Sequence, residues 1–247
     1  MAARGFIQHR LMIHRAHAAL ILVVVAIAGA YLWWRVGMLA WVRRDHVVGI
    51  DVSHHQGSID WRRVREAGVG FAILKATEGV TFTDSAFAEN FRAAGRAGLV
   101  RGAYHFFTFC TPGKDQAAHF AEIVPVEAGA LPPVIDLELG GNCAARPAPD
   151  RLKAELDDFL GVIEPRYGQA ILYITEDFYE RYGAVTEGRK LFLREIFQEP
   201  RWAEGRPWLL WQFHNSGRID GVEGPVDLDA LQGSMDLLRA LARPTPK

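Results

Sequence analysis

The sequence predicts an α/β barrel that follows one apolar N-terminal helix. Between residues 47 and 182, β-rich runs alternate five times with helical patterns, and further short β-rich runs come after them. Such alternation gives parallel strands joined by crossover helices. Because extra strands follow the fifth unit, we expect a closed barrel rather than an open sheet. In addition, acidic and aromatic residues recur where the predicted strands end, which is where such barrels place their functional sites.

The N-terminal residues predict a single membrane-spanning helix. Residues 18–34 carry no charged side chain, and the apolar character resumes after Arg35 and continues to Val42. At 1.5 Å per residue, the uncharged stretch is about 26 Å long, close to the roughly 30 Å hydrocarbon core of a bilayer. Three tryptophans suit the interfacial belt of a membrane: Trp33, Trp34 and Trp41.

A cleavable signal peptide is the alternative for this segment. Arginines precede the apolar run, and residues 28–30 (AGA) form a passable small-residue cleavage site. We prefer an uncleaved anchor, because the apolar stretch is longer than a usual signal-peptide core. The expected organisation is a cytoplasmic N-terminus over 1–17, an anchor or uncleaved signal over 18–42, a barrel domain over 47–241 and a tail over 242–247.

Within the barrel domain, each predicted strand is followed by its predicted helix. The pairs, strand first, are residues 47–52 and 61–67, 71–75 and 85–97, 99–107 and 113–124, 133–138 and 150–163, and 170–174 and 176–182. Two further strands are expected at 191–194 and 208–213. This arrangement gathers the C-terminal ends of the parallel strands at one rim of the barrel.

Composition argues against several classes of function. The net charge of −1, with lysines and arginines scattered along the chain, gives no basis for nucleic-acid binding. Cys110 and Cys143 are too few for a disulfide framework or a four-cysteine zinc site, and form either one bridge or two buried thiols. His54, His55 and His105 lack a recognised metal-ligand spacing. We therefore expect no metal, no cofactor, no nucleic-acid partner and a monomeric protein.

Asp136 and Glu138 are the strongest candidates for chemistry. They follow the uncharged run 131–135, and at a spacing of i, i+2 on a strand they point to the same side, roughly 6.6 Å apart. A pair of solvated acids is the simpler interpretation, but the apolar run is typical of a buried strand. Glycoside hydrolysis uses two such carboxyl groups, one protonated and one ionised, and the longer side chain favours Glu138 as the acid.

The spacing of this pair leaves the stereochemical outcome open. It exceeds the ~5–5.5 Å of a direct carboxylate nucleophile and falls at the start of the inverting range of ~6.5–9.5 Å. Further acids come from Asp51, near the C-terminus of the first predicted strand, and from Asp227, in the segment 226–229 (VDLD) near the C-terminus of the chain. Crowded carboxyl groups raise each other's pKa, so one of them can stay protonated near neutral pH. Lys75 and Glu78 are expected to form an ion pair at the rim.

Six segments of the barrel domain resemble, in order, those of glycoside hydrolase family 25 lysozymes: 49–57 (GIDVSHHQG), 74–79 (LKATEG), 102–107 (GAYHFF), 133–138 (PVIDLE), 211–213 (WQF) and 226–229 (VDLD). The resemblance implies an irregular TIM-like barrel with five βα units closed by additional β-strands. It implies Glu138 as the general acid and Asp51, Asp136 and Asp227 as the other active-site carboxylates. It also implies substrate contacts from Tyr104, Tyr173, Trp211 and Gln212.

Two positions depart from the family pattern. Asp229 stands where the family usually has asparagine. Residues 191–195 (LFLRE) stand where the family usually has a strand that contains tryptophan, so this side of the cleft is expected to differ.

The resemblance implies an N-acetylmuramidase that cleaves the β-1,4 bond between N-acetylmuramic acid and N-acetylglucosamine in peptidoglycan. Because this substrate is N-acetylated, we expect a retaining reaction assisted by the substrate's acetamido group, with Asp136 steadying the cation. The alternatives are a catalytically weak, membrane-anchored peptidoglycan-binding protein and a hydrolase of another N-acetylhexosamine polymer such as chitin. Peptidoglycan lies outside the cytoplasmic membrane, so we expect a single-pass protein of the bacterial cytoplasmic membrane with its catalytic domain on the periplasmic or cell-wall side.

Overall fold

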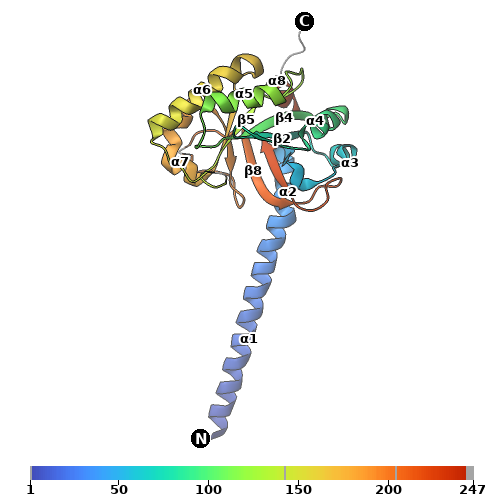
Figure 1. Ribbon diagram of the computed structural model, residues 1–247. Coiled ribbons are helices and arrows are strands. Elements are labelled where there is room, and N and C mark those ends of the chain that lie inside the picture. Colours follow the sequence, from blue (N-terminus) through green and yellow to red (C-terminus); the bar gives the residue numbers. More distant parts are fainter. Residues whose placement is uncertain (1, 142, 204, 243–247) are drawn as a thin grey trace. The chain divides into compact units, whose positions relative to one another are not determined.

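The computed structural model describes residues 2–141, 143–203 and 205–242, and for residues 2–13 and 35–36 it describes the backbone alone. The chain forms two units, a helical unit that ends at Trp41 and a barrel unit that begins at Val42 (Figure 1). The predicted apolar helix and the predicted α/β barrel are therefore both present.

The helical unit is built on one long helix, α1 (Ala2–Leu32), followed by a π-helical turn, η1 (Trp33–Gly37), and the start of α2 (Met38–Asp45). Within α1, the segment His14–Leu32 is long and apolar enough to cross a membrane, and none of it is buried inside the protein. Leu22, for example, is 70% exposed. A continuous exposed apolar surface of this kind marks a site of membrane or protein interaction. A signal sequence near an N-terminus has the same properties, so the anchor stays a prediction.

The barrel unit contains eight strands that close on themselves. In order around the sheet they are β1 (Val47–Val52), β2 (Phe71–Glu78), β4 (Val100–Phe106), β5 (Val134–Leu137), β6 (Ile171–Ile174), β7 (Lys190–Arg194), β8 (Leu210–Gly217) and β9 (Val226–Leu231). Neighbours from β1 to β8 are parallel, whereas β9 is antiparallel to both β8 and β1 and completes the barrel. The short strand β3 (Phe82–Thr83) forms a hairpin with the end of β2.

The first five strands of this order are each followed by an α-helix, and Figure 1 shows these helices around the strands. They are α3 (Trp61–Glu66), α4 (Phe87–Arg96), α5 (Gly113–Ile123), α6 (Pro149–Tyr167) and α7 (Glu176–Tyr182). Two 3₁₀ turns, η2 (His54–Gln56) and η3 (Gly183–Thr186), and the C-terminal helix α8 (Met235–Leu241) complete the unit. The five predicted strand–helix units and the closed barrel are confirmed, whereas the sequence reasoning assigned no element to β3, β9 or α8.

Local sequence explains where a helix begins and which face it buries. Helix α3 begins after Asp60, whose carboxylate accepts hydrogen bonds from the amides of Arg62 and Arg63, both at 3.1 Å. Such a cap satisfies amide groups that have no partner within the helix. In α4, Phe87 and Phe91 are one turn apart and both are 2% exposed, so this face of the helix packs toward the core of the barrel unit.

Side chains that point into the barrel form an apolar floor below its C-terminal rim. Phe71 and Ile73 of β2 belong to this buried cluster, together with Phe192 of β7 and Leu231 of β9. Gly49 of β1 leaves room for the floor, because a Cβ atom at this position would lie 2.3 Å from the Phe71 ring. Burial of a phenylalanine of this kind stabilises the fold by about 1.5–3 kcal/mol. Closer to the C-terminal rim, the inward-pointing residues of these strands are polar, and they form the site described below.

A disulfide bridge joins Cys110 to Cys143, with their Cα atoms 6.0 Å apart. The choice between one bridge and two thiols, left open by the sequence, is therefore settled in favour of the bridge. Cys110 lies in the loop after β4 and Cys143 in the loop after β5. Glu138, the predicted acid, directly follows β5, so the bridge tethers the loop that begins at this residue.

Replacing both cysteines by serine (Cys110→Ser with Cys143→Ser) should lower the free energy of unfolding by about 2–4 kcal/mol, because the bridge closes a long loop in the unfolded chain. Urea denaturation under non-reducing conditions measures this difference. With excess reductant, the wild-type protein and the variant should unfold at similar urea concentrations. Equal stability without reductant would contradict the prediction.

Candidate functional site

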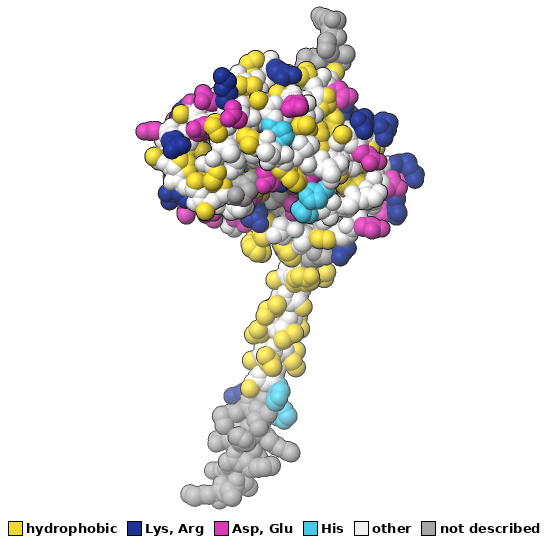
Figure 2. Space-filling view, viewed as in Figure 1, with side chains coloured by type: hydrophobic (Ala, Val, Ile, Leu, Met, Phe, Trp, Pro, Cys, Tyr) yellow, Lys and Arg dark blue, Asp and Glu magenta, His cyan; other side chains and the backbone are white. Residues whose placement is uncertain are grey.

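A cavity of about 330 Å³ opens at the C-terminal rim of the barrel. In Figure 2, acidic side chains are visible in a hollow of the barrel unit with histidine side chains beside them. The residues that line the cavity come from all eight barrel strands or from the segments just after them: Asp51, Ile73, Lys75, Tyr104, Phe106, Val134, Asp136, Glu138, Tyr173, Phe192, Arg194, Gln212, Asn215 and Asp227. Parallel strands bring their C-terminal ends together in this way, so residues distant in sequence share one cavity.

The cavity brings together seven of the eight predicted site residues. All four predicted carboxyl groups line it: Asp51, Asp136, Glu138 and Asp227. Three of the four predicted substrate contacts line it as well: Tyr104, Tyr173 and Gln212. These seven residues thus lie together at one rim, as the argument from strand ends predicts. Their roles in a reaction remain proposals.

Trp211 is the exception, because its side chain does not line the cavity. Its side chain is fully buried, and its ring centroid lies 5.6 Å from the ring centroids of both Trp208 and Phe213. The indole N–H donates to the carbonyl oxygen of Glu195 at 2.6 Å. Successive side chains of a strand point to opposite faces, so Gln212 in the cavity requires Trp211 to point away from it.

Arg194 is the main residue that the sequence reasoning missed. It ends β7, beside Gln212 of β8 in the sheet register, and lines the cavity. Its positive charge acts to lower the pKa of Asp51, Glu138 and Asp227. The argument from strand ends, applied to the predicted strand 191–194, would have found this arginine. Asn215 gave no such signal, because it lies beyond an irregularity in the β8–β9 register.

Burial is the largest influence on the acids of the cavity. It raises the pKa of Asp136 well above its usual range, and the charges of Glu138 and Asp51 raise it further, while Lys75 opposes them. Burial also raises the pKa of Asp51 and Glu138, and with the charge of Asp51 it raises the pKa of Asp227 to about 8. A low-dielectric cavity with several like charges disfavours ionisation, so the group holds protons at neutral pH.

A chain of hydrogen bonds connects two of these acids. The Tyr173 hydroxyl donates to Gln212 Oε1 at 3.0 Å, and Gln212 Nε2 donates to Asp51 Oδ2 at 2.8 Å. Tyr173 also lies within hydrogen-bonding contact of Glu138. Both linking side chains are buried, and the ring of Tyr173 packs edge-on against Phe192 at 4.9 Å. Tyr173 and Gln212 therefore hold the acids in place, and their polar atoms are already engaged within the protein.

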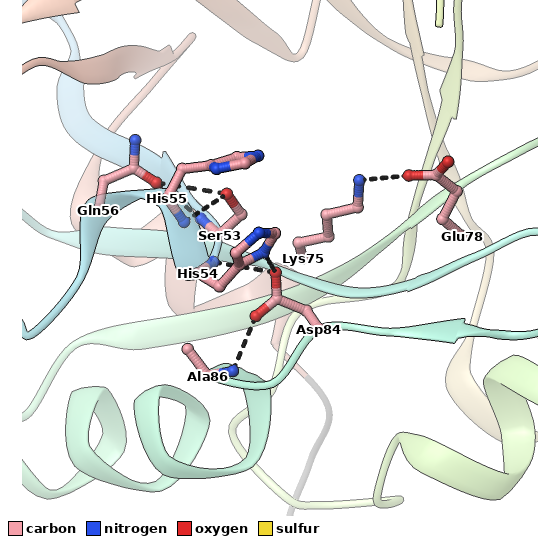
Figure 3. A network of polar contacts seen from close by, with 8 residues as sticks. All are labelled: Ser53, His54, His55, Gln56, Lys75, Glu78, Asp84 and Ala86. Atoms are coloured by element: carbon pink, nitrogen blue, oxygen red, sulfur yellow. Dashed lines mark hydrogen bonds and ion pairs between the residues drawn. The ribbon is translucent and has the colours of Figure 1, made fainter. Parts of the chain in front are cut away.

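Hydrogen bonds and ion pairs also join side chains at the edge of the barrel beside the cavity (Figure 3). The predicted Lys75–Glu78 ion pair is confirmed at 2.6 Å, with the Lys75 ammonium 5.2 Å from the ring centres of Phe82 and Phe106. His54 Nδ1 lies 2.8 Å from Asp84 Oδ2, in contact with a buried carboxyl group.

The histidines considered as metal ligands do not converge. His105 is fully buried, with its ring nitrogens hydrogen-bonded to Thr77 at 2.7 Å and to Gln116 at 3.0 Å. His54 and His55 pack ring against ring at 4.0 Å on η2. Within the described residues, no group of three or more histidines, cysteines or acids is arranged to hold a metal ion.

Comparison with known proteins identifies relatives along most of the chain. The family model of the glycosyl hydrolases family 25 matches residues 50–222. The chain is 34% identical over 215 residues to Lysozyme M1 of Streptomyces globisporus, which covers 81% of this chain and 72% of that protein. Among solved structures, it is similar to a family 25 glycosyl hydrolase from Bacillus anthracis, with a TM-score of 0.74, 33% identity and coverage of 80% of this chain and 94% of that one. It is also similar to a bacterial lysozyme from Streptomyces coelicolor, with a TM-score of 0.71 and 32% identity. The match covers 79% of this chain and 96% of that one.

Proposed function

The chain belongs to the glycosyl hydrolases of family 25 and is a glycoside hydrolase, and we propose that it cleaves the β-1,4 bond between N-acetylmuramic acid and N-acetylglucosamine in peptidoglycan. The observation that carries this proposal is the cavity, in which four carboxyl groups meet at one barrel rim. Relatives named as lysozymes favour peptidoglycan as the substrate.

Glu138 is proposed as the proton donor. Burial raises its pKa, whereas the positive charge of Arg194 lowers it, so these opposing influences tune a carboxyl group that has to give up and regain a proton. Its position two residues after Asp136 takes it one pleat further toward the mouth of the cavity. In the first step, the Glu138 proton goes to the leaving glycosidic oxygen as the bond to the anomeric carbon breaks.

Asp136 is proposed to steady the positive charge that then develops on the sugar. One of its carboxylate oxygens is buried and has no hydrogen-bond partner among the described residues, so it is available to a group of the substrate. We propose that the substrate's own acetamido oxygen attacks the anomeric carbon and that Asp136 accepts a hydrogen bond from the acetamido N–H. Water then attacks the same carbon from the opposite side, the bond from that carbon to the acetamido oxygen breaks, and the water gives a proton to Glu138, which gives net retention.

Changing Glu138→Gln should slow the clearing of a peptidoglycan suspension by about 10²–10⁴-fold, because an amide cannot donate the required proton. Turbidity loss over time measures the rate. Glu180→Gln, an exposed change on α7, is the matched control and should clear at the wild-type rate. Equal clearing by Glu138→Gln and wild type would refute the assignment of the acid. If the wild-type protein sediments with peptidoglycan without clearing it, a binding protein is favoured, and sugar release from chitin alone favours another polymer.

The first sugar product should have the β configuration at its new reducing end, because two successive displacements at the anomeric carbon restore the original configuration. Proton NMR of the anomeric signals, recorded before mutarotation, measures this outcome. An α product would exclude the acetamido-assisted route and would require water to attack directly.

We also propose that residues 18–42 anchor the protein in the cytoplasmic membrane, with residues 1–17 on the cytoplasmic side and the barrel unit exported. The exposed apolar segment His14–Leu32 supports a membrane location. The Cys110–Cys143 bridge supports an oxidising compartment for the barrel unit. The proposed substrate, which lies outside that membrane, requires the same orientation.

A C-terminal fusion to a reporter active only outside the cytoplasm should be active and should remain with the membrane fraction, because the apolar helix is retained. A fusion to a reporter active only in the cytoplasm should be silent. Activity of the second fusion would overturn the topology. Release of the first fusion in a shortened form would identify the segment as a cleaved signal peptide.

A further inference from the structure

Asp229 is a buried carboxyl group that the proposed reaction does not use. It lies on β9 two residues after Asp227, on the same face of the strand, and its side chain is fully buried. Leu231, two residues further along, belongs to the apolar floor of the barrel. Asp229 therefore occupies the level between the polar cavity and the apolar floor.

The neighbours of Asp229 in the sheet give it no hydrogen-bond donor. Its register partner on β1 is Gly49, where the Phe71 ring fills the space of the missing side chain. Its partner on β8 is Gln212, whose amide N–H donates to Asp51 and whose oxygen accepts from Tyr173. In the described part of the chain, neither carboxyl oxygen of Asp229 has a hydrogen-bond donor.

On β1, Asp51 lies two residues from Gly49, the register partner of Asp229, and points to the same side of the strand. The carboxyl groups of Asp51 and Asp229 are thereby at hydrogen-bonding range. Two ionised carboxylates offer only acceptors and repel each other, so this contact requires a proton between them. A fully buried carboxylate with no donor is also costly, which again favours the protonated form. The contact with Asp51 and the burial of Asp229 without a donor therefore each favour a proton on this pair of acids.

The charged groups around this pair do not supply a counter-charge to Asp229. Asp51 on β1 and Asp227 on β9 are the charged groups that act on it, and both are acids. The cation Arg194 on β7 acts on Asp51 and Asp227. On β8, Gln212 is uncharged, and His214, opposite Leu228, accepts a hydrogen bond from the Ser216 amide through Nδ1 at 3.1 Å.

We infer that Asp229 and Asp51 share one proton, and that Asp229 is thereby a positioning residue that holds the Asp51 carboxyl group at the base of the cavity. With this proton on Asp229, Asp51 accepts hydrogen bonds from Gln212 and from Asp229, and the carboxyl group of Asp227 is at hydrogen-bonding range of Asp51 as well. The positioning role rests on the proposed function, since it assigns Asp51 to the active site. The shared proton does not, because it is a property of the folded protein alone.

The proton is tested by the stability of Asp229→Asn across pH. Burial and the two neighbouring acids raise the pKa of Asp229 in the folded state, so folding of the wild type binds a proton that the unfolded chain releases above its ordinary pKa of 3.8. Wild-type stability is therefore lost as the pH rises above this value, and the asparagine variant lacks that loss. The ratio of the two folding constants should grow in favour of Asp229→Asn by up to tenfold per pH unit between pH 5 and 7, about 1.4 kcal/mol per unit.

Urea denaturation of the full chain at a series of pH values measures this ratio, with Asp158→Asn, an exposed change on α6, as the matched control. The control should show a ratio that does not change over the same pH range. A constant ratio for Asp229→Asn would overturn the shared proton, whether or not the protein degrades peptidoglycan.

Activity tests the positioning role separately. Asp229→Asn keeps a hydrogen-bond donor for Asp51, whereas Asp229→Leu has the same branched shape, with methyl groups in place of the polar atoms, and no donor. The asparagine variant should therefore retain a kcat/KM for peptidoglycan at least tenfold above that of the leucine variant at pH 6. Equal kcat/KM for two folded variants would overturn the positioning role. If the leucine variant fails to fold, the comparison passes to Asp229→Ala, with the same expected difference.

Discussion

Antiparallel pairing of β9 with β8 on one side and with β1 on the other closes the sheet into a barrel. Closure brings the ends of seven parallel strands to one rim, and it places Gln212 of β8 within 2.8 Å of Asp51 of β1. Because β9 runs in the opposite direction, Asp227 reaches the same rim from the beginning of its strand. In an open sheet, β1 and β8 would lie at opposite edges, and the acids would not share a cavity.

The alternation of side chains along these strands divides the inside of the barrel into levels. Phe71 and Leu231 belong to the apolar floor, and Asp51 and Asp227 line the cavity above it. The floor excludes water from below, so burial becomes the largest influence on every perturbed acid of the site. Such a site disfavours several ionised carboxylates when no substrate is bound. It is well suited to a reaction in which positive charge appears on the substrate and a carboxyl group supplies a proton.

Much of the fold and of the site could be predicted from the sequence, because both depend on local patterns. The five strand–helix units follow from alternating periodicity, and Asp136 and Glu138 follow from an apolar run that ends in two acids. Trp211 was expected in the cavity because its motif was taken as a unit, although alternation allows only one of Trp211 and Gln212 to face the cavity. The contact between Asp51 and Asp229 could not be predicted, since it depends on the register of two strands that are distant in sequence.

The bridge between Cys110 and Cys143 also makes part of the covalent structure depend on the compartment that holds the chain. It joins the loops that follow β4 and β5, and the second of these loops leaves Glu138. Bridges of this kind form in oxidising compartments, whereas reducing ones keep cysteines as thiols. In a reducing compartment, a newly made chain therefore lacks the covalent link between these two loops, the second of which begins at Glu138. The covalent link between the two loops therefore forms only where the two sulfur atoms can be oxidised.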